Sequence, residues 1–281
     1  MKGNWFSRAL LLAVTVFMVF LGGAPAARGE TSYVLGVVPQ MTATDTFKAW
    51  TPFAEALSSQ LGVTFKLKVY PTIPVFEEDV LKGGPDFVYM NPYHAVMAKK
   101  EYVPLVRDKA GLVGILVARK AGDIKSISDL KGKTLVFPSP NAFAASLYMR
   151  ALLSEKEKIK FDAKYVKNHQ NVYRAVAMKM APAGGGVQKT LEKEDAALKD
   201  QLMVLYKTPS AASHPFAAEK RIPAEFRAKV EEAILRMAKD PKYASLLKGI
   251  QLPDPVQANY AKDYAPLQAL GLEKFVVMGE D

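Results

Sequence analysis

The stretch Asp86-Phe-Val-Tyr-Met-Asn-Pro-Tyr93 places an apolar run directly before an Asn-Pro pair. The run predicts a short buried strand, because it is apolar and follows the chain-breaking Gly83-Gly84-Pro85. Asn at an N-cap and Pro at the first helical position predict that a helix begins at once. A strand that leads straight into a helix is typical of β-α-β proteins with a mostly parallel sheet and helices on both faces.

Upstream of this stretch the chain alternates in the same way. Strands are predicted over residues 33–38 and 63–70. Between them, Thr44 or Asp45 is expected to cap a helix that Gly62 ends. The apolar residues of this helix recur at three- and four-residue steps and should share a buried face: Phe47, Trp50, Ala54, Leu57 and Leu61. Pro74 is expected to open a short second helix.

A second unit of the same kind is predicted downstream. Its strands are expected over 111–119, 134–137, 161–166, 202–206 and 216–219, and its helices over 142–153, about 172–180 and after Pro223. Pro182 and Gly184-Gly185-Gly186 are expected to break the chain.

One of these units interrupts the other, which predicts two lobes connected by two crossing strands. The crossings are placed near Gly114–Ala118 and Ser213–Ala217. The first lobe is expected to comprise residues 27–113 and 214–281, and the second lobe residues 114–213. Ligands of such sheets lie at the carboxyl ends of strands, so we expect a site in the cleft between the lobes.

The N-terminus has the three-part pattern of a secretory signal peptide. Lys2 and Arg8 precede an apolar run from Ala9 to Leu21, and small residues follow over 22–27. Cleavage is expected after Ala26, with Ala27 and Gly29 marking a second choice. An uncleaved anchor is the alternative, although 13 apolar residues are short for a membrane span. Residues 1–26 therefore predict export of a soluble protein to the periplasm.

Composition excludes several classes of function. The 281 residues include no Cys and three His, so a disulfide scaffold, a Cys-ligated metal or cluster and a thiol nucleophile are excluded. The chain has no G-x-S-x-G turn and no His spacing typical of a metal site, so we expect neither an enzyme nor a cofactor. The formal net charge of +10 becomes +8 without Lys2 and Arg8 (10 − 2). In an exported protein this charge favours an anionic ligand rather than nucleic acid. A metal-dependent hydrolase is kept as a minor alternative.

Three strand-to-helix turns and one glycine run carry the candidate ligand-binding residues. Amides at helix starts after Asn91, Asn141 and Asn171 can hold an anion, and nearby side chains can add donors. Packing is the alternative for each side chain, and His94 and His214 are interpreted as structural. Pro39-Gln40-Met41-Thr42 is a weaker candidate cleft loop. The predicted ligand-binding residues are Asn91, Tyr93, His94, Ser139, Asn141, Ala142, His169, Gln170 and Gly185.

Several of these motifs, in this order, resemble the PhnD-like family of phosphate, phosphite and phosphonate substrate-binding proteins of ABC transporters. The resemblance is carried by Tyr33–Pro39, Trp50-Thr-Pro-Phe53, Asp86–Tyr93, Ser128-Asp-Leu-Lys-Gly-Lys133, the turn at Phe137–Ala145, His169 and Ser213-His-Pro-Phe216. It covers nearly the whole mature chain. It implies an α/β, two-lobed type II periplasmic-binding-protein fold, with mostly parallel sheets and two crossing hinge strands.

The family resemblance also implies the function. We expect a monomeric periplasmic protein that captures a small oxyanion, phosphate, phosphite or phosphonate-like, for an ABC permease; the alternative is a ligand-sensing partner of a membrane sensor kinase. His169 matches the ligand-binding His of the family. The chain departs from the family at two places. Pro140-Asn-Ala-Phe-Ala-Ala145 lacks three hydroxyls of the usual Ser-Thr-Ser-Gly run, and Ala183-Gly-Gly-Gly-Val187 lacks the acids that an amine-bearing phosphonate needs.

Overall fold

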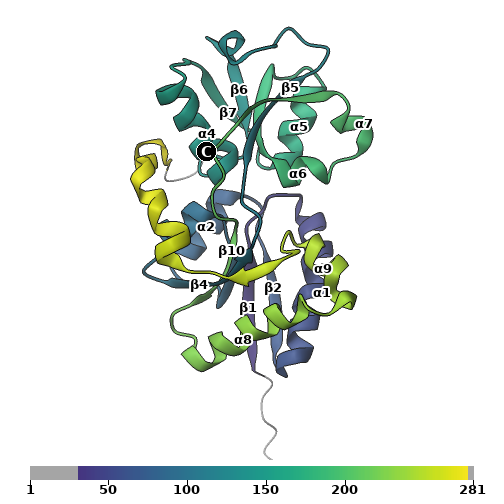
Figure 1. Cartoon of the computed structure of the whole chain (residues 1–281), viewed down its shortest axis with the longest axis vertical. Helices are drawn as coiled ribbons and strands as arrows, with labels where there is room; N and C mark the ends of the chain where they lie inside the picture. The colour runs from purple at the N-terminus through teal and green to yellow at the C-terminus, as the bar shows by residue number, and fades with distance from the viewer. Residues whose placement is uncertain (1–30, 278–281) are drawn as a thin grey trace, which may run out of the picture. The chain divides into compact units, whose positions relative to one another are not determined.

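The computed structural model describes residues 31–277, which contain two separate β-sheets (Figure 1). The first sheet contains β1 (Ser32–Val37), β2 (Thr64–Val69), β3 (Phe87–Tyr89), β4 (Tyr102–Asp108), β10 (Pro215–Glu219) and β11 (Pro255–Gln257). The second contains β5 (Gly114–Arg119), β6 (Thr134–Phe137), β7 (Asp162–Tyr165), β8 (Ala183–Val187) and β9 (Leu202–Lys207). Each sheet and its helices form one lobe, which confirms the predicted two-lobed α/β fold.

Helices connect the strands. They are α1 (Ala43–Leu61), α2 (Ile73–Leu81), α3 (Pro92–Met97), α4 (Tyr148–Ala151), α5 (His169–Ala177), α6 (Gln188–Glu192), α7 (Ala196–Lys199), α8 (Ala224–Met237) and α9 (Ala244–Gly249). The π-helical turns η2 (Phe143–Leu147) and η3 (Leu152–Lys156) extend α4 on both sides, so the chain is helical from residue 143 to 156. Among residues 31–277, no helix is both long and apolar enough to cross a membrane.

The five strands of the second sheet repeat the arrangement of β4-β10-β3-β1-β2 in the first sheet, which β11 extends by one strand. The full strand orders are β11-β4-β10-β3-β1-β2 and β7-β6-β8-β5-β9. In the first sheet β1 pairs in parallel with β2 and β3, whereas β10 runs antiparallel to β3 and β4. In the second sheet β6 pairs in parallel with β7 and β8, whereas β5 runs antiparallel to β8 and β9. The sheets are therefore mixed and not mostly parallel as predicted, because one strand of each arrives through a crossing segment and inserts antiparallel.

The lobes are connected by two crossing segments that pair with each other. Leu112 and Ala211 exchange backbone hydrogen bonds of 2.8 and 3.0 Å. This places the first crossing slightly before the predicted Gly114–Ala118, because β5 already belongs wholly to the second sheet. The predicted lobe boundaries themselves stay a prediction.

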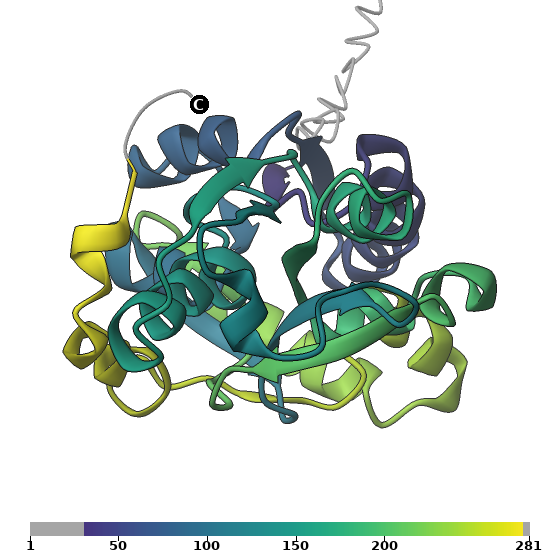
Figure 2. The same cartoon turned by 90° about the horizontal axis from the view of Figure 1, so that it is seen from above.

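Apolar side chains on alternating positions of the second sheet bury both of its faces. Ile115 and Val117 pack with Val172 of α5, whereas Leu116 and Ala118 pack with Met149 of α4. Figure 2 shows helices on both sides of this sheet. The larger core of the first lobe is built around Trp50, Phe53 and Leu57 of α1, all nearly or fully buried. Helices on both faces fix the sheets, so the loops at the strand ends are held in place.

Several predictions about single elements were wrong. Thr42, rather than Thr44 or Asp45, caps α1, because its hydroxyl accepts a hydrogen bond from Asp45 N. Phe47 is 55% exposed, although the periodicity placed it on the buried face. The strand β4 was missed between the predicted elements, and the Gly184–Gly186 run lies in the buried strand β8 rather than in a break. The signal peptide prediction falls on residues 1–26, outside the described residues.

Candidate functional site

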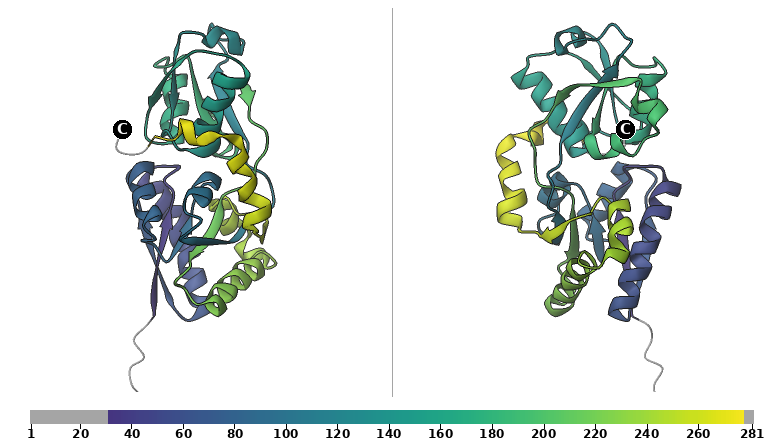
Figure 3. Two further views of the ribbon diagram at one scale, coloured as in Figure 1. Left: turned by 90° about the vertical axis from the view of Figure 1, so that its left-hand side faces the viewer. Right: turned by 45° about the vertical axis from the view of Figure 1, so that its right-hand side comes forward.

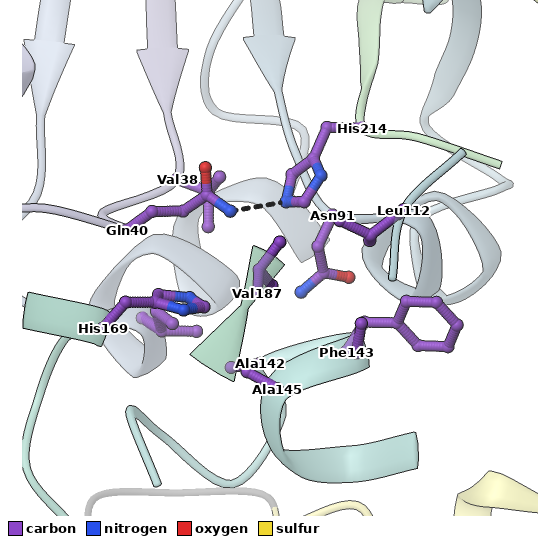
Figure 4. A pocket seen from close by; sticks show the side chains of 12 residues that line it. Val38, Gln40, Asn91, Leu112, Ala142, Phe143, Ala145, His169, Val187 and His214 are labelled. Carbon is purple, nitrogen blue, oxygen red and sulfur yellow. Dashed lines mark hydrogen bonds between the residues drawn. The ribbon is translucent and has the colours of Figure 1, made fainter. Parts of the chain in front are cut away.

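A small cavity lies at the facing ends of the two sheets (Figure 4). The first lobe and the crossing segments contribute Val38, Gln40, Ile73, Asn91, Leu112 and His214; the second lobe contributes Ala142, Phe143, Ala144, Ala145, His169 and Val187. Its free space is about 10 Å³, roughly room for one water molecule. In this conformation the two lobes contact each other beside the site, and a guest larger than a water molecule requires them to separate.

The second lobe presents a turn of backbone amides to this cavity. The helical run that begins at Phe143 leaves its first N–H groups without acceptors inside the helix. Ala142 N donates to Ser139 O and Ser146 N to Ala142 O, but the N–H groups of Phe143, Ala144 and Ala145 find no acceptor within residues 31–277. Three neighbouring unpaired donors form an anion site of the kind that helix starts provide.

Glycines in β5 and β8 allow this turn to pack directly against the backbone of the second sheet. A Cβ at Gly185 would lie 1.9 Å from Ala145 O, and one at Gly114 would lie 2.1 Å from Ala144 O. Any larger residue would push the helix start outward. The physical role of the glycine run is thus close packing of a helix onto β8, which is why the sequence pattern alone was misread as a break.

Two buried histidines in the cavity wall are neutral. Burial lowers the pKa of His169 to about 3. Burial, followed by the charges of nearby histidines and Lys189, holds the pKa of His214 well below its usual range. The Gln40 side-chain amide donates to His214 Nε2 at 3.0 Å, while its oxygen accepts from the Gln251 amide at 2.9 Å. The lining residues among the described part of the chain therefore carry no formal charge, and any anion there would be held by neutral donors.

Beside the cavity, a buried polar network connects the two lobes. His94 Nε2 donates to Glu77 Oε1 at 2.6 Å, and the Asn141 amide donates to Glu77 Oε2 at 3.0 Å. The Asn91 amide donates to Asn141 O at 3.1 Å, and its side-chain oxygen caps α3 by accepting from His94 N. Since Glu77, Asn91 and His94 belong to the first lobe and Asn141 to the second, this network exists only when the lobes are closed.

The structure brings together some of the predicted ligand-binding residues and separates others. Asn91, Ala142 and His169 line the cavity. The remaining six lie outside its lining. His94 and Asn141 belong to the polar network, Tyr93 packs against Phe143, and Ser139 is buried. Gln170 is hydrogen-bonded to Thr42 and Asp45, and Gly185 lies under Ala145. Asn168 rather than Asn171 caps α5, so His169 is the first residue of that helix. Whether these nine residues contact a ligand stays a prediction.

Sequence reasoning missed several lining residues. His214 was interpreted as structural, yet it lies in the cavity wall and stacks on Tyr89 at 5.4 Å between ring centroids. Leu112 and Val187 were missed because an apolar residue next to a crossing segment looks like core. The weaker candidate loop at Gln40 did carry a usable signal, a polar residue directly after the first strand. Among residues 31–277, no group of three metal-ligating side chains is found.

Comparison with known proteins places these features in a family. Residues 35–264 match the family described as the periplasmic substrate-binding protein of phosphonate ABC transporters. The fold is similar to a binding protein of an ABC phosphonate transporter from Pseudomonas aeruginosa, at a TM-score of 0.78, 17% identity and 86% coverage of both chains. It is also similar to PhnD1 of Prochlorococcus marinus in complex with methylphosphonate, at a TM-score of 0.77 and 17% identity, covering 86% of this chain and 97% of that one. A chloride-bound protein from Xanthomonas citri has a TM-score of 0.71 at 15% identity, covering 87% of this chain and 98% of that one.

Proposed function

The chain belongs to the family of periplasmic substrate-binding proteins of phosphonate ABC transporters, and we propose that it captures a phosphorus oxyanion with three oxygens and one apolar corner. Members of this family bind a small molecule in the periplasm and pass it to a permease. The finer proposal concerns which small molecule the cavity between the lobes accepts.

The unpaired amides of Phe143, Ala144 and Ala145 carry this proposal. Amides at a helix start favour an anion without needing a cation nearby. Hydrogen bonds to a charged acceptor contribute about 1.5–3 kcal/mol each, roughly twice a neutral bond. His169 stands beside these amides as a further neutral donor. Three oxygens of one ligand can therefore be satisfied from the second lobe, with Asn91 facing them from the first.

The rest of the cavity wall supports an apolar corner. Its apolar lining residues include Val38, Ile73, Leu112, Val187 and Phe143. A fourth oxygen turned toward this wall would lose its water without gaining a hydrogen bond, at a cost of about 1–3 kcal/mol. A P–H or P–CH₃ group turned toward this wall loses no hydrogen bond, because it makes none with water. Phosphite and methylphosphonate should therefore bind better than phosphate, and an aminoalkylphosphonate should bind poorly because no carboxylate lines the described cavity.

Isothermal titration of purified, dialysed protein with four ligands tests the proposal. Methylphosphonate and phosphite should bind at least about tenfold more tightly than phosphate and 2-aminoethylphosphonate, since 1.4 kcal/mol corresponds to a factor of ten. Tighter binding of phosphate would refute the apolar corner, and heat from none of the four would refute capture of phosphorus oxyanions. Pull-down of the liganded protein with a permease or with a sensor-kinase ectodomain separates import from the signalling alternative.

A further inference from the structure

The C-terminal segment, residues 258–277, runs from the first sheet to the second lobe, and we call it the strap. It leaves β11, which pairs with β4, and forms the short helical turns η5 (Tyr260–Tyr264), η6 (Ala265–Leu270) and η7 (Leu272–Phe275). Figures 1 and 3 show it in yellow along one side of both lobes. It is thus a third connection between the lobes, beside the two crossing segments.

The first half of the strap is fixed to the first lobe. Asp263 pairs with Arg107 of β4 at 3.0 Å, and both side chains are largely buried. Tyr264 is fully buried, and its hydroxyl donates to Ser213 O at 3.0 Å. Because Ser213 lies in a crossing segment next to β10, this half of the strap has to move with the first lobe.

The end of the strap is fixed to the second lobe. The Asn141 side chain makes a two-way contact with Val277: its amide donates to Val277 O at 2.8 Å, and its oxygen accepts from Val277 N at 3.0 Å. Arg150 of α4 donates to Phe275 O at 2.8 Å. On the surface, Lys274 pairs with Glu155.

Asn141 is where these contacts meet the site. The same side chain donates to Glu77 of the first lobe, and the backbone carbonyl of Asn141 accepts from Asn91. The cavity-lining turn begins at the next residue. From this geometry we propose that the strap is a latch: its end grips the second lobe when the lobes are closed and releases it when they open. Asn141 is the residue of the second lobe to which the end of the strap is hydrogen-bonded. The proposal adds to the proposed function a gate on ligand entry and exit.

A covalent tether tests whether release is needed for opening. The chain has no Cys, so Glu155→Cys with Lys274→Cys can be joined specifically by a short bis-maleimide. Both positions are about half exposed, so the variant should fold. Glu78→Cys with Lys82→Cys, an exposed i,i+4 pair between α2 and the residue that caps its C-terminus, is the matched control for linker and chemistry. Stopped-flow binding of methylphosphonate should slow at least tenfold in association and dissociation for the tethered strap, and not for the control.

Unchanged rates in the tethered strap would overturn the latch. If methylphosphonate does not bind even the unmodified protein, the proposed function fails, and small-angle scattering tests the latch without a ligand. The tethered strap should then keep a smaller radius of gyration than the untethered protein. Equal radii would overturn the latch independently of the ligand.

A single substitution gives the opposite perturbation. Asn141→Ala removes the bonds to Val277 and Glu77, so the ligand-free protein should have a larger radius of gyration and methylphosphonate should dissociate at least fivefold faster. Asn259→Ala is the matched control, because its side chain caps η5 within the strap and touches neither lobe's site. A variant whose melting temperature falls while its radius of gyration stays at the wild-type value would identify Asn141 as merely structural and overturn its role in the latch.

Discussion

Gly185→Ala should move the amide turn without replacing any polar side chain. The new Cβ would lie 1.9 Å from Ala145 O and 2.6 Å from the Phe137 ring, whereas real Cβ contacts below 3.0 Å are essentially never seen. The helix start must therefore retreat by at least 3.0 − 1.9 = 1.1 Å. Overpacking of this kind costs about 1–3 kcal/mol. The lower entropy of the unfolded Ala chain offsets about 0.5–1 kcal/mol of it.

The measured consequences separate stability from binding. The net loss centres on about 1 kcal/mol, which should lower the melting temperature by about 2–4 °C for a chain of this size. An amide displaced by about 1 Å leaves hydrogen-bond range, so methylphosphonate affinity should fall about 10- to 100-fold in titration. Gly249→Ala is the control, since a Cβ there meets nothing within 4 Å. A Gly185→Ala protein with wild-type melting temperature and affinity would refute the packing argument for the glycine run.

Two further predictions follow from buried ionisable groups. The pKa of His169 is lowered to about 3, so the folded protein keeps this ring neutral while the unfolded chain, with a pKa near 6.5, takes up a proton. The free energy of unfolding should therefore fall as pH drops from about 6.5 toward 3, by about 1.4 kcal/mol per pH unit. Urea unfolding at pH 7.5 and pH 5 should show a smaller fall for His169→Gln than for the wild type. Lys189 of the second lobe pairs with Asp108 of the first, whose side chain is 1% exposed. Lys189→Met should cost about 3 kcal/mol in urea unfolding by leaving a buried carboxylate unpaired, whereas the double variant with Asp108→Asn should recover most of it; equal stabilities of the two would contradict this.

The sequence predicted most of the fold because periodicity and caps act locally. The Asn91-Pro92 pair set the start of α3, and Gly62 ended α1 with a positive φ of 65°. Errors arose where tertiary contacts overrule the local pattern. Glycines normally weaken a strand, yet Gly184–Gly186 form the middle of β8 because helix backbone and Tyr173 occupy the space of their missing side chains.

The candidate site was less predictable than the fold for the same reason. A turn that begins a helix could be located from sequence, and three of the predicted residues, Asn91, Ala142 and His169, line the cavity. Their contact with a ligand stays a prediction. The sequence does not show which polar side chains are already hydrogen-bonded to other residues, because those residues are distant in the chain. Asn141 is engaged by Glu77, 64 residues away, and by Val277, 136 residues away. No local pattern carries information about contacts of that range.

This use of polar groups by the lobes themselves bears on the proposed preference of the site for an anion. In the closed form His169 N donates to Gln40 O, and Asn91 donates to Asn141 O. A ligand that uses these two donors must replace existing bonds, whereas the amide turn that begins at Phe143 offers vacant ones. Exchanging one neutral hydrogen bond of about 1 kcal/mol for another gains nothing, whereas exchanging it for a charge-assisted bond gains about 0.5–2 kcal/mol. By this reasoning a neutral guest gains nothing at the two engaged donors, whereas the proposed anion with several oxygens gains at each of them. Selectivity for charge then arises because the ligand and the opposite lobe compete for the same hydrogen-bond donors. Weakening the contacts between the lobes should therefore reduce this selectivity and also speed the opening of the lobes.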